Sequence, residues 1–380
     1  MREVDNDEKY FIAFSLVPGI GPARLKLLID YFGSAQKAWE AGETVINQVG
    51  LPKDALTEFI NVRQKLNLDQ YIANLEKRGV KILTFNNKFY PKHLKVIPNP
   101  PNVLYLKTNL TAEVFYNLAS GRNLGVVGTR KITSYGKEIT ANLVAGLVSA
   151  GFVITSGLAL GVDGMAHQTT IDCNGKTIAV LGAGVEVVYP REHADLYRKI
   201  IATGGAIISE VAPEKFVAKG IFPARNRIIS GLSQALLVTE GAIDSGSLIT
   251  ARAALDQGRE VFAVPGPINS PMAEGTNYLL KQGAKLVTRV EDILEEMGVT
   301  NKASNSARLP DGQVTQLPNK NLPKGETPQE QKILDLLYHE NLEFDDLVVK
   351  TGFEAGQLIS ILTNLELNKK VQVNGLVYGL

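Results

Sequence analysis

The chain has 380 residues, of which 44% are hydrophobic and 21% charged, and a formal net charge of +1. This composition is ordinary for a globular protein of two or three domains, and no apolar run reaches the roughly 20 residues needed to span a bilayer. The first ten residues, MREVDNDEKY, lack the apolar core of a signal peptide, and a single cysteine excludes an intramolecular disulfide. We therefore expect a cytoplasmic protein in a reducing compartment, with no membrane contact.

Charge is distributed unevenly along the chain. Residues 1–65 carry 8 Lys and Arg against 9 Asp and Glu, residues 66–325 carry 28 against 21, and residues 326–380 carry 4 against 9. A contact with a polyanion is therefore expected in the middle of the chain. A surplus of this size over so many residues is unremarkable by itself, so the prediction depends on the basic groups converging on one site.

Residues 1–68 are predicted to be helical and to resemble a helix-hairpin-helix. In SLVPGIGPARLKLLIDYFGS, a Pro-Gly-Ile-Gly turn is followed by Pro22, which opens a second helix with apolar residues at i, i+3, i+4 and i+7. Gly33 and Ser34 are expected to end that helix and cap the next. Glycine N–H groups of such a hairpin can hold a nucleic-acid phosphate. Because this region is slightly acidic, a DNA contact and a purely structural helical cap both stay open.

Residues 69–298 alternate strand-like runs with helical segments. The runs are continuously apolar, which is typical of strands buried on both faces of a parallel sheet: VKILTF, NVLYL, LGVVG, FVITS, TIAVLG, AIISE, ALLVTE, VFAVPG and AKLV. Helices are expected between them, over 135–150, 162–173, 193–202, 247–257 and 278–282. The predicted fold class is an extended Rossmann-like, doubly wound and mostly parallel α/β sheet. Ligands of such sheets bind beyond the carboxyl ends of the strands.

The last part of the chain is predicted to be a separate small domain. Residues 299–325 are polar and contain Pro, Asn, Gly and Lys, as expected of a flexible linker. In residues 326–380, Thr327 and Pro328 begin a helix, two more helices follow, and Asn374-Gly375 marks a terminal hairpin. Three helices and a hairpin indicate a winged-helix-like domain. The domain is acidic and lacks a basic helix that could read a DNA groove. We therefore expect it to make a protein contact or to have an accessory role.

The first strand-to-helix junction of the parallel sheet favours phosphate over a dinucleotide. The segment GVVGTR, residues 125–130, lacks the G-x-G-x-x-G fingerprint, and no acidic residue ends the next strand, which finishes in Ser156-Gly157. Hydroxyl groups, open backbone N–H groups and Arg130 are all hydrogen-bond donors. Such a set suits phosphate oxygens or a carboxylate and does not select a ribose.

Later strand ends carry the same chemistry. Arg191 follows a Tyr-Pro turn, a basic stretch with two phenylalanines runs from Lys215 to Arg227, and Gly246-Ser247 begins a helix. Arginine forks bind phosphates, and nearby aromatic rings can stack on unpaired bases. Each basic residue alone is a common solvated surface charge. Several of them at the ligand-binding edge of one sheet predict a phosphate-backbone cradle.

Five segments of the middle region form a recognisable set. In chain order they are GVVGTRKITSYG, SGLALGVDGMAH, TIAVLGAGVEVVYPREH, FPARNRIISGLSQALLVTEGAIDSGSLITARAALDQGREVFAVPG and EGTNYLLKQGAKLV, and they cover most of residues 75–298. Together they resemble the DNA-processing protein A family, also called DprA or Smf. The resemblance implies a bacterial protein that binds incoming single-stranded DNA during natural transformation, protects it and helps load the RecA recombinase. It also implies a homodimer formed through the Rossmann-like domain, with no cofactor and no established catalytic activity.

The resemblance also implies site residues. The DNA-binding set is Gly128, Thr129, Arg130, Ser156, Gly157, Arg191, Lys219, Arg225, Asn226 and Arg227, to which the helix start adds Gly246 and Ser247. The dimer surface would include Leu255, Asn277, Leu280 and Leu286, for which a role in the protein core is an open alternative. Leu160 stands where many relatives have Lys or Arg. Losing one phosphate contact should flatten the salt dependence of binding by about one unit of slope.

Two other functions are alternatives, a phosphoribohydrolase enzyme and a protein-only adaptor. The sheet also resembles nucleoside-monophosphate phosphoribohydrolases, whose phosphate loop P-G-G-x-G-T-x-x-E carries a catalytic glutamate. Aligning Gly246-Ser247 with the Gly-Thr of that loop places Thr250 at the glutamate, and threonine does no acid–base work at neutral pH. Glu240 precedes the loop and is interpreted as a strand-end residue. A protein-only adaptor is disfavoured by the cluster of arginines.

Metal and ATP sites are not predicted. The four histidines and Cys173 show no metal-ligand spacing, and the chain lacks a Walker loop. His167 lies four residues after Asp163 on an expected helix, and we interpret it as a packing residue. Cys173 is interpreted as a buried thiol.

Overall fold

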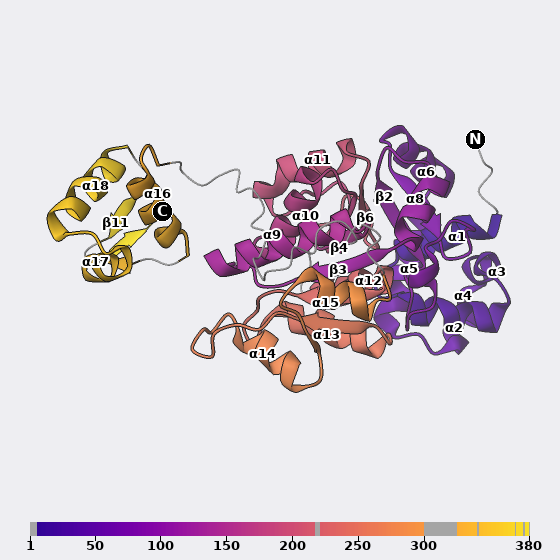
Figure 1. Ribbon diagram of the computed structural model, residues 1–380. Helices are drawn as coiled ribbons and strands as arrows, with labels where there is room; N and C mark the ends of the chain where they lie inside the picture. Colours follow the sequence, from indigo (N-terminus) through magenta and orange to yellow (C-terminus); the bar gives the residue numbers. More distant parts are fainter. Residues whose placement is uncertain are drawn as a thin grey trace. The chain divides into compact units, whose positions relative to one another are not determined.

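The structure is a computed structural model that describes residues 6–216, 221–299, 325–339, 342–368, 370–374 and 377–379. The chain divides into two compact units, Met1–Lys302 and Ala303–Leu380. The first unit contains the N-terminal helices and a large sheet flanked by helices, and the second contains a small helical domain with a short sheet (Figure 1).

Short helices make up the N-terminal region. They are α1 (Asn6–Ser15), α2 (Pro22–Phe32), α3 (Ala35–Glu40), α4 (Glu43–Ile46), the 3-10 helix η1 (Asn47–Val49), α5 (Lys53–Lys65) and α6 (Leu68–Lys77). As predicted, Pro22 opens α2 and Gly33 ends it in the left-handed region, at φ 86°. The Ser34 hydroxyl oxygen accepts a hydrogen bond from the Lys37 N–H and so caps α3. Local sequence signals therefore set these helix ends.

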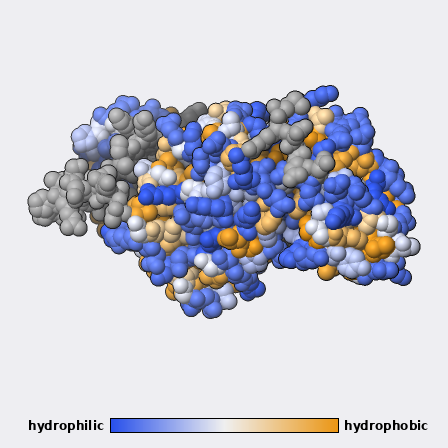
Figure 2. Space-filling model, turned by 90° about the vertical axis from the view of Figure 1, so that its right-hand side faces the viewer, coloured by the Kyte–Doolittle hydropathy of each residue, from blue (hydrophilic) through white to orange (hydrophobic). Residues whose placement is uncertain are grey.

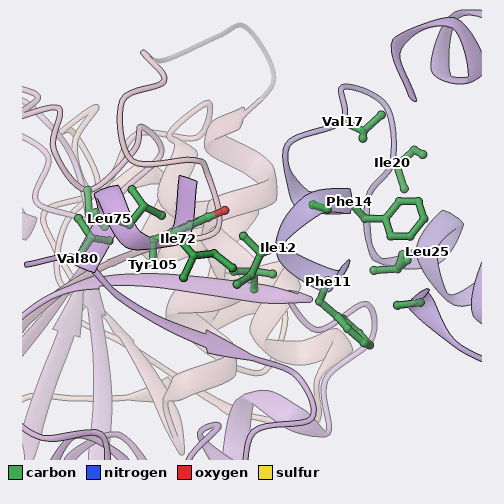
Figure 3. Packing of buried hydrophobic residues seen from close by; sticks show 14 of the residues in the cluster. Phe11, Ile12, Phe14, Val17, Ile20, Leu25, Ile72, Leu75, Val80 and Tyr105 are labelled. Carbon is green, nitrogen blue, oxygen red and sulfur yellow. The ribbon is translucent and has the colours of Figure 1, made fainter. Parts of the chain in front are cut away.

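The N-terminal helices share a hydrophobic core with the sheet. Figure 3 shows part of this cluster, labelled at Phe11, Ile12, Phe14, Val17, Ile20, Leu25, Ile72, Leu75, Val80 and Tyr105. The rings of Phe14 and Phe59 stack with their centroids 5.6 Å apart, and Trp39 meets Phe14 edge-on at 5.1 Å. The same cluster includes the buried Leu158 of the sheet region. The helices are thus packed directly against the part of the chain that carries the strand ends.

Nine strands form one sheet in the order β1-β2-β6-β5-β4-β3-β7-β8-β9. They are β1 (Lys81–Thr84), β2 (Val103–Lys107), β3 (Asn123–Val127), β4 (Val153–Ser156), β5 (Thr177–Val180), β6 (Ala206–Ser209), β7 (Ala235–Val238), β8 (Glu260–Ala263) and β9 (Lys285–Leu286). The β1–β2 and β2–β6 pairs are antiparallel, and the other pairs are parallel. The nine predicted strands and the doubly wound, mostly parallel fold class are confirmed. The strand order reverses at β3, where ligand sites of such sheets form.

Helices cover both faces of the sheet (Figure 1). They are α7 (Lys92–Lys95), α8 (Ala112–Ser120), α9 (Ser134–Ser149), α10 (Val162–Asp172), η2 (Arg191–His193), α11 (Ala194–Ala202), α12 (Ile221–Leu232), α13 (Gly246–Asp256), α14 (Glu274–Lys281) and α15 (Val290–Glu296). Strand β7 shows why its run is continuously apolar. Ala235 and Leu237 belong to a cluster with residues of α9 and α10, whereas Leu236 and Val238 belong to one with residues of α12 and α13.

Two features differ from the sequence prediction. The segment FPARNR was grouped with the strand ends and placed in none of the expected helices, but it lies in helix α12. Pro223 is in the first helical turn, where a missing N–H breaks no helical hydrogen bond. Cys173, expected to be buried, is exposed. It caps the carboxyl end of α10, where the chain turns back toward β5 and the side chain faces outward.

The second unit has the predicted winged-helix arrangement. It contains α16 (Pro328–His339), β10 (Leu342–Glu343), α17 (Phe344–Thr351), α18 (Ala355–Leu367), β11 (Gln372–Asn374) and β12 (Val377–Gly379). The three strands pair antiparallel in the order β10-β12-β11, and β11 and β12 form the terminal hairpin. Leucine side chains of all three helices form its core, including Leu334, Leu347 and Leu358. Gly375 of the hairpin lies outside the described residues.

No helix in the described part of the chain is long and apolar enough to cross a membrane. On the side that carries the N-terminal helices, hydrophilic residues predominate, and hydrophobic residues form separate patches (Figure 2). The apolar residues of these helices lie mainly in the internal cluster of Figure 3.

Candidate functional site

The carboxyl ends of β4, β3 and β7 lie side by side because these strands are parallel neighbours. A cavity of about 470 Å³ opens at this edge. It brings together seven predicted DNA-binding residues: Gly128, Thr129, Arg130, Arg225, Asn226, Gly246 and Ser247. These residues come from three separate segments of the chain, and among them Arg130 and Arg225 are the basic residues that the sequence predicted for the site.

A smaller hollow of about 60 Å³ adjoins this cavity and shares Arg130 and Arg225 with it. Its other lining is largely apolar and includes Leu160, Leu181, Val187, Tyr189 and Pro190. Leu160 and Tyr189 are exposed. The edge of the sheet therefore offers a cavity with several charged and hydroxyl side chains beside a more apolar hollow, and Arg130 and Arg225 line both.

Arg225 is a buried arginine with only 7% of its surface exposed. One guanidinium nitrogen, Nη1, donates to the carbonyl oxygen of Gly157 at 2.7 Å and to that of Val180. Its Nε donates to the Asn226 side chain at 3.1 Å. Burial lowers the pKa of Arg225, and the nearby Asp163 opposes that shift. Arg225 thus ties together the ends of β4 and β5 beneath the cavity.

Asp163, in the first turn of α10, completes this buried arrangement. Its Oδ2 accepts hydrogen bonds from the N–H groups of Gly157 at 3.1 Å and Ala159 at 3.4 Å. Burial raises the pKa of Asp163, and Arg225 and these hydrogen bonds act in the opposite direction. Between the two N–H donors, Leu158 has a left-handed backbone with φ 58°. The loop after β4 is therefore held by a carboxylate on one side and a guanidinium on the other.

Helix α13 presents its amino end to the cavity. Ser245 is the N-cap, and its hydroxyl oxygen accepts from the Ser247 N–H at 3.3 Å and lies 2.8 Å from the Ser247 hydroxyl. The Asn226 side-chain amide donates to the Gly246 carbonyl at 3.3 Å, which links α12 to α13. Backbone N–H groups at a helix start favour anions. The predicted helix start at Gly246-Ser247 is confirmed.

A family model described as DNA recombination-mediator protein A matches residues 81–298, more than half of the chain. The chain belongs to the DprA family. A second model, the DprA winged helix domain, matches residues 318–373. Protein Smf from Synechocystis is 33% identical over 384 residues, which cover 96% of this chain and 96% of that protein. The suspected family is confirmed, and its members are DNA-processing, recombination-mediator proteins.

Two solved DprA structures are similar in fold. The X-ray structure of DprA from Streptococcus pneumoniae has a TM-score of 0.65 at 31% identity, and the match covers 78% of this chain and 99% of that one. DNA processing protein A from Helicobacter pylori, whose structure was described for its single-stranded DNA binding mode, has a TM-score of 0.50 at 29% identity and covers 57% and 95%. These matches agree with the Rossmann-like sheet described above.

The other predicted DNA-binding residues of this DprA chain do not line the larger cavity. Gly157 lines the small hollow, but its N–H and carbonyl are both used inside the protein. The buried Ser156 hydroxyl donates to the Val126 carbonyl at 2.6 Å. Arg227 faces Glu210 and donates to both of its carboxylate oxygens, at 2.7 and 2.6 Å. Arg191 is exposed beyond the Tyr189-Pro190 segment of the hollow.

Lys219 lies outside the described residues. Conversely, the cavity contains residues that the sequence analysis did not select, among them Lys131, Asp163, Asp244 and Met272. Lys131 follows Arg130 directly in the same loop, so its basic charge could have been used to predict it as a site residue. Met272 lies far from the other segments along the chain, and nothing in its local sequence indicates a place at this edge.

Thr250 and Glu240 are the two residues that bear on the rival phosphoribohydrolase function. Thr250 lines the cavity at the position aligned with the catalytic glutamate of phosphoribohydrolases, and its hydroxyl donates to the Gly246 carbonyl at 3.3 Å. Glu240 follows β7 and is buried, with both carboxylate oxygens accepting hydrogen bonds from Thr133. Thr250 has the place of the catalytic glutamate but not a carboxylate, and the carboxylate of Glu240 is engaged by Thr133.

His167 packs inside the sheet layer. Its Nδ1 lies 2.6 Å from the Thr177 hydroxyl, which itself donates to the Ile154 carbonyl, so Nδ1 carries the proton and donates to Thr177. Burial lowers the pKa of His167 to about 3. Asp163 bonds to backbone N–H groups instead of forming the i,i+4 pair. Among the described residues, no group of His, Cys, Asp or Glu side chains could hold a metal ion.

Proposed function

We propose that this DprA-family protein binds single-stranded DNA at the carboxyl edge of the sheet, protects it, and helps load RecA during natural transformation. The observation that carries the proposal is the convergence of exposed Arg130 and Lys131 with the amino end of α13 on one cavity. Cationic side chains and helix-start N–H groups both favour phosphate oxygens. The described single-stranded DNA binding mode of the Helicobacter pylori relative supports the same ligand.

The adjoining hollow favours unpaired over paired DNA. Exposed Leu160 and Tyr189 line it together with Pro190, and an aromatic or apolar surface can stack on a base that has left its partner. In a duplex the base faces are stacked inside, so no base is free to enter the hollow. We therefore infer that the polar cavity holds the backbone and that the hollow receives a base, with little base preference.

Binding is tested by fluorescence anisotropy with a labelled dT oligonucleotide and a matching duplex across a salt series. We expect tighter binding of the single strand and a fall in affinity with rising salt. Arg130→Ala should weaken binding about tenfold for every sequence and reduce the salt slope by about one. Arg122→Ala is the matched control, because Arg122 is exposed and precedes β3, at the opposite end of the strand that Arg130 follows. Equal affinity for duplex, or equal effects of the two substitutions, would contradict the proposal.

We also propose a homodimer through the Rossmann-like domain. Leu255 and Leu286 are each 55% exposed, an arrangement that favours contact with a second copy over the role in the core left open by the sequence. Leu280 is partly buried against the cluster beneath α13. The Asn277 side chain hydrogen-bonds to Gly266 through both its oxygen and its nitrogen, at 3.3 and 3.1 Å. Asn277 would then support the dimer surface through these hydrogen bonds.

A further inference from the structure

Glu240 is a buried acidic residue that the proposed cradle does not itself use as a DNA contact. It comes two residues after strand β7 and is 4% exposed. Its carbonyl oxygen accepts a hydrogen bond from the Thr129 N–H at 2.7 Å. Its carboxylate accepts two more from Thr133, the N–H at 2.9 Å and the hydroxyl at 2.6 Å. One residue therefore holds both ends of the loop from Thr129 to Thr133.

That loop carries the two exposed basic residues of the cavity. Arg130 and Lys131 lie between the two anchored threonines, and both line the cavity. Neither anchor involves a basic side chain. The Glu240 carboxylate oxygens are already engaged by Thr133, so we expect Glu240 to affect DNA through the position of the loop and not through a direct contact.

The same contacts connect the loop to helix α9. Thr133 is the N-cap of α9. Its hydroxyl oxygen accepts a hydrogen bond from the Gly136 N–H at 3.0 Å, and the same hydroxyl donates a hydrogen bond to the Glu240 carboxylate. A Cβ atom at Gly136 would lie 2.2 Å from the carboxylate oxygen Oε2, so the carboxylate fills the space beside the helix start. A chain of hydrogen bonds thus runs from the first turn of α9 through Thr133 to the end of β7.

We propose that Glu240 is a positioning residue for DNA binding, which holds Arg130 and Lys131 in place for the phosphate backbone. This inference rests on the proposed single-stranded DNA function. A loop fixed at both ends presents its cations already ordered, whereas a loop released at Thr133 has to be ordered when DNA binds. The Thr129 anchor uses the Glu240 backbone carbonyl and stays when the side chain is lost. Loss of the Glu240 carboxylate should therefore weaken DNA binding.

The sign of the effect separates this role from a purely electrostatic one. A negative charge close to a phosphate-binding cavity repels DNA, so its removal would tighten binding if Glu240 acted only as a charge. The positioning role predicts the opposite sign. It also predicts that the effect passes through Arg130 and Lys131 and vanishes when those side chains are absent.

The test is a double-mutant cycle measured by anisotropy with a dT oligonucleotide. We expect Glu240→Ala to weaken binding about tenfold in the wild-type background, as two side chains lose their order. It should change binding less than about twofold in an Arg130→Ala, Lys131→Ala background. Glu240→Gln, which keeps one oxygen for the Thr133 N–H, should lose less affinity than Glu240→Ala. Thr239→Val is the matched control, because Thr239 is buried next to Glu240 and accepts a hydrogen bond from Thr140 inside α9 instead of from the loop.

The outcomes distinguish the inference from the function on which it rests. If Arg130→Ala weakens binding but Glu240→Ala does not, or tightens it, the positioning role is wrong and the function stands. An equal loss in both backgrounds, or an equal loss in Thr239→Val, would assign the effect to general destabilisation and overturn the inference. If the unaltered protein does not bind the oligonucleotide, both proposals fail together.

Discussion

Arg130 and Arg225 were predicted to play the same role but lie in different environments. Both arginines line the cavity and the hollow, but Arg130 is exposed, whereas Arg225 is buried and donates to two backbone carbonyls. Asp163 complements Arg225 by accepting from the N–H groups of the loop after β4. At the residue scale, the site therefore combines an exposed arginine with a buried arginine and a buried aspartate that both hold the loop after β4.

Arg225→Ala should lower stability more at neutral than at acid pH. Burial raises the pKa of Asp163 and Arg225 opposes the shift, so the substitution should raise that pKa further. A carboxyl group with a raised pKa in the folded state lowers stability above that pKa, and this penalty fades as the pH falls toward the ordinary value of 3.8. We expect a loss of about 3 kcal/mol at pH 7.5 and a smaller loss at pH 5, measured by urea unfolding. The exposed Arg130→Ala is the control, and equal losses for Arg225→Ala at both pH values would exclude the coupling to Asp163.

At the scale of elements, the site is built where α12 and α13 begin and where loops follow β3 and β4. Helix α12 supplies Arg225 and Asn226, and Asn226 bonds to the first residue of α13. The predicted helix start at Gly246 followed from Gly-Ser chemistry. Helix α12 was not among the expected helices, although its proline lies in the first turn, where proline is compatible with a helix.

Ser245→Ala should destabilise the protein by about 1 kcal/mol, because it removes the N-cap of α13. Ser245→Gly should cost only a few tenths of a kcal/mol, since glycine is tolerated at an N-cap. Both changes are measured by urea unfolding at pH 7.5. Ser149→Ala is a control at the end of α9, where the hydroxyl donates to the Ala145 carbonyl and caps no helix start, and we expect a change within about 0.5 kcal/mol. A loss in this control as large as in Ser245→Ala would contradict the capping role.

At the scale of the whole molecule, the first unit joins the N-terminal helices to the sheet through one hydrophobic cluster. Leu158, whose neighbours Gly157 and Ala159 are held by Asp163, belongs to the same cluster as Phe14 and Trp39. The sequence predicted two separate domains over residues 1–68 and 69–298. The structure shows that these two regions share a hydrophobic core. The second unit has its own hydrophobic core.

Leu255→Glu should convert the proposed dimer to a monomer. The exposed leucine gains a charge that a second copy would have to bury, whereas folding of the single chain leaves it in water. Light scattering after gel filtration, with and without a dT oligonucleotide, should report a mass close to the 41.2 kDa of one chain for the variant and twice that mass for the unaltered protein. Val96→Glu, at another exposed apolar position with 76% exposure, should leave the mass unchanged. A monomeric unaltered protein at every concentration would refute the dimer.

The sequence by itself determined the strands, the helix ends at Pro22, Gly33 and Gly246, and the edge of the sheet at which basic residues gather. These features follow from local chemistry, since continuous apolar runs, glycines and prolines act on their immediate backbone. Only the tertiary structure decided which basic groups face the cavity. Arg130 is exposed there, Arg225 is buried below it, and Arg227 pairs with Glu210. The reason is that each outcome depends on partners distant in sequence, which no local pattern encodes.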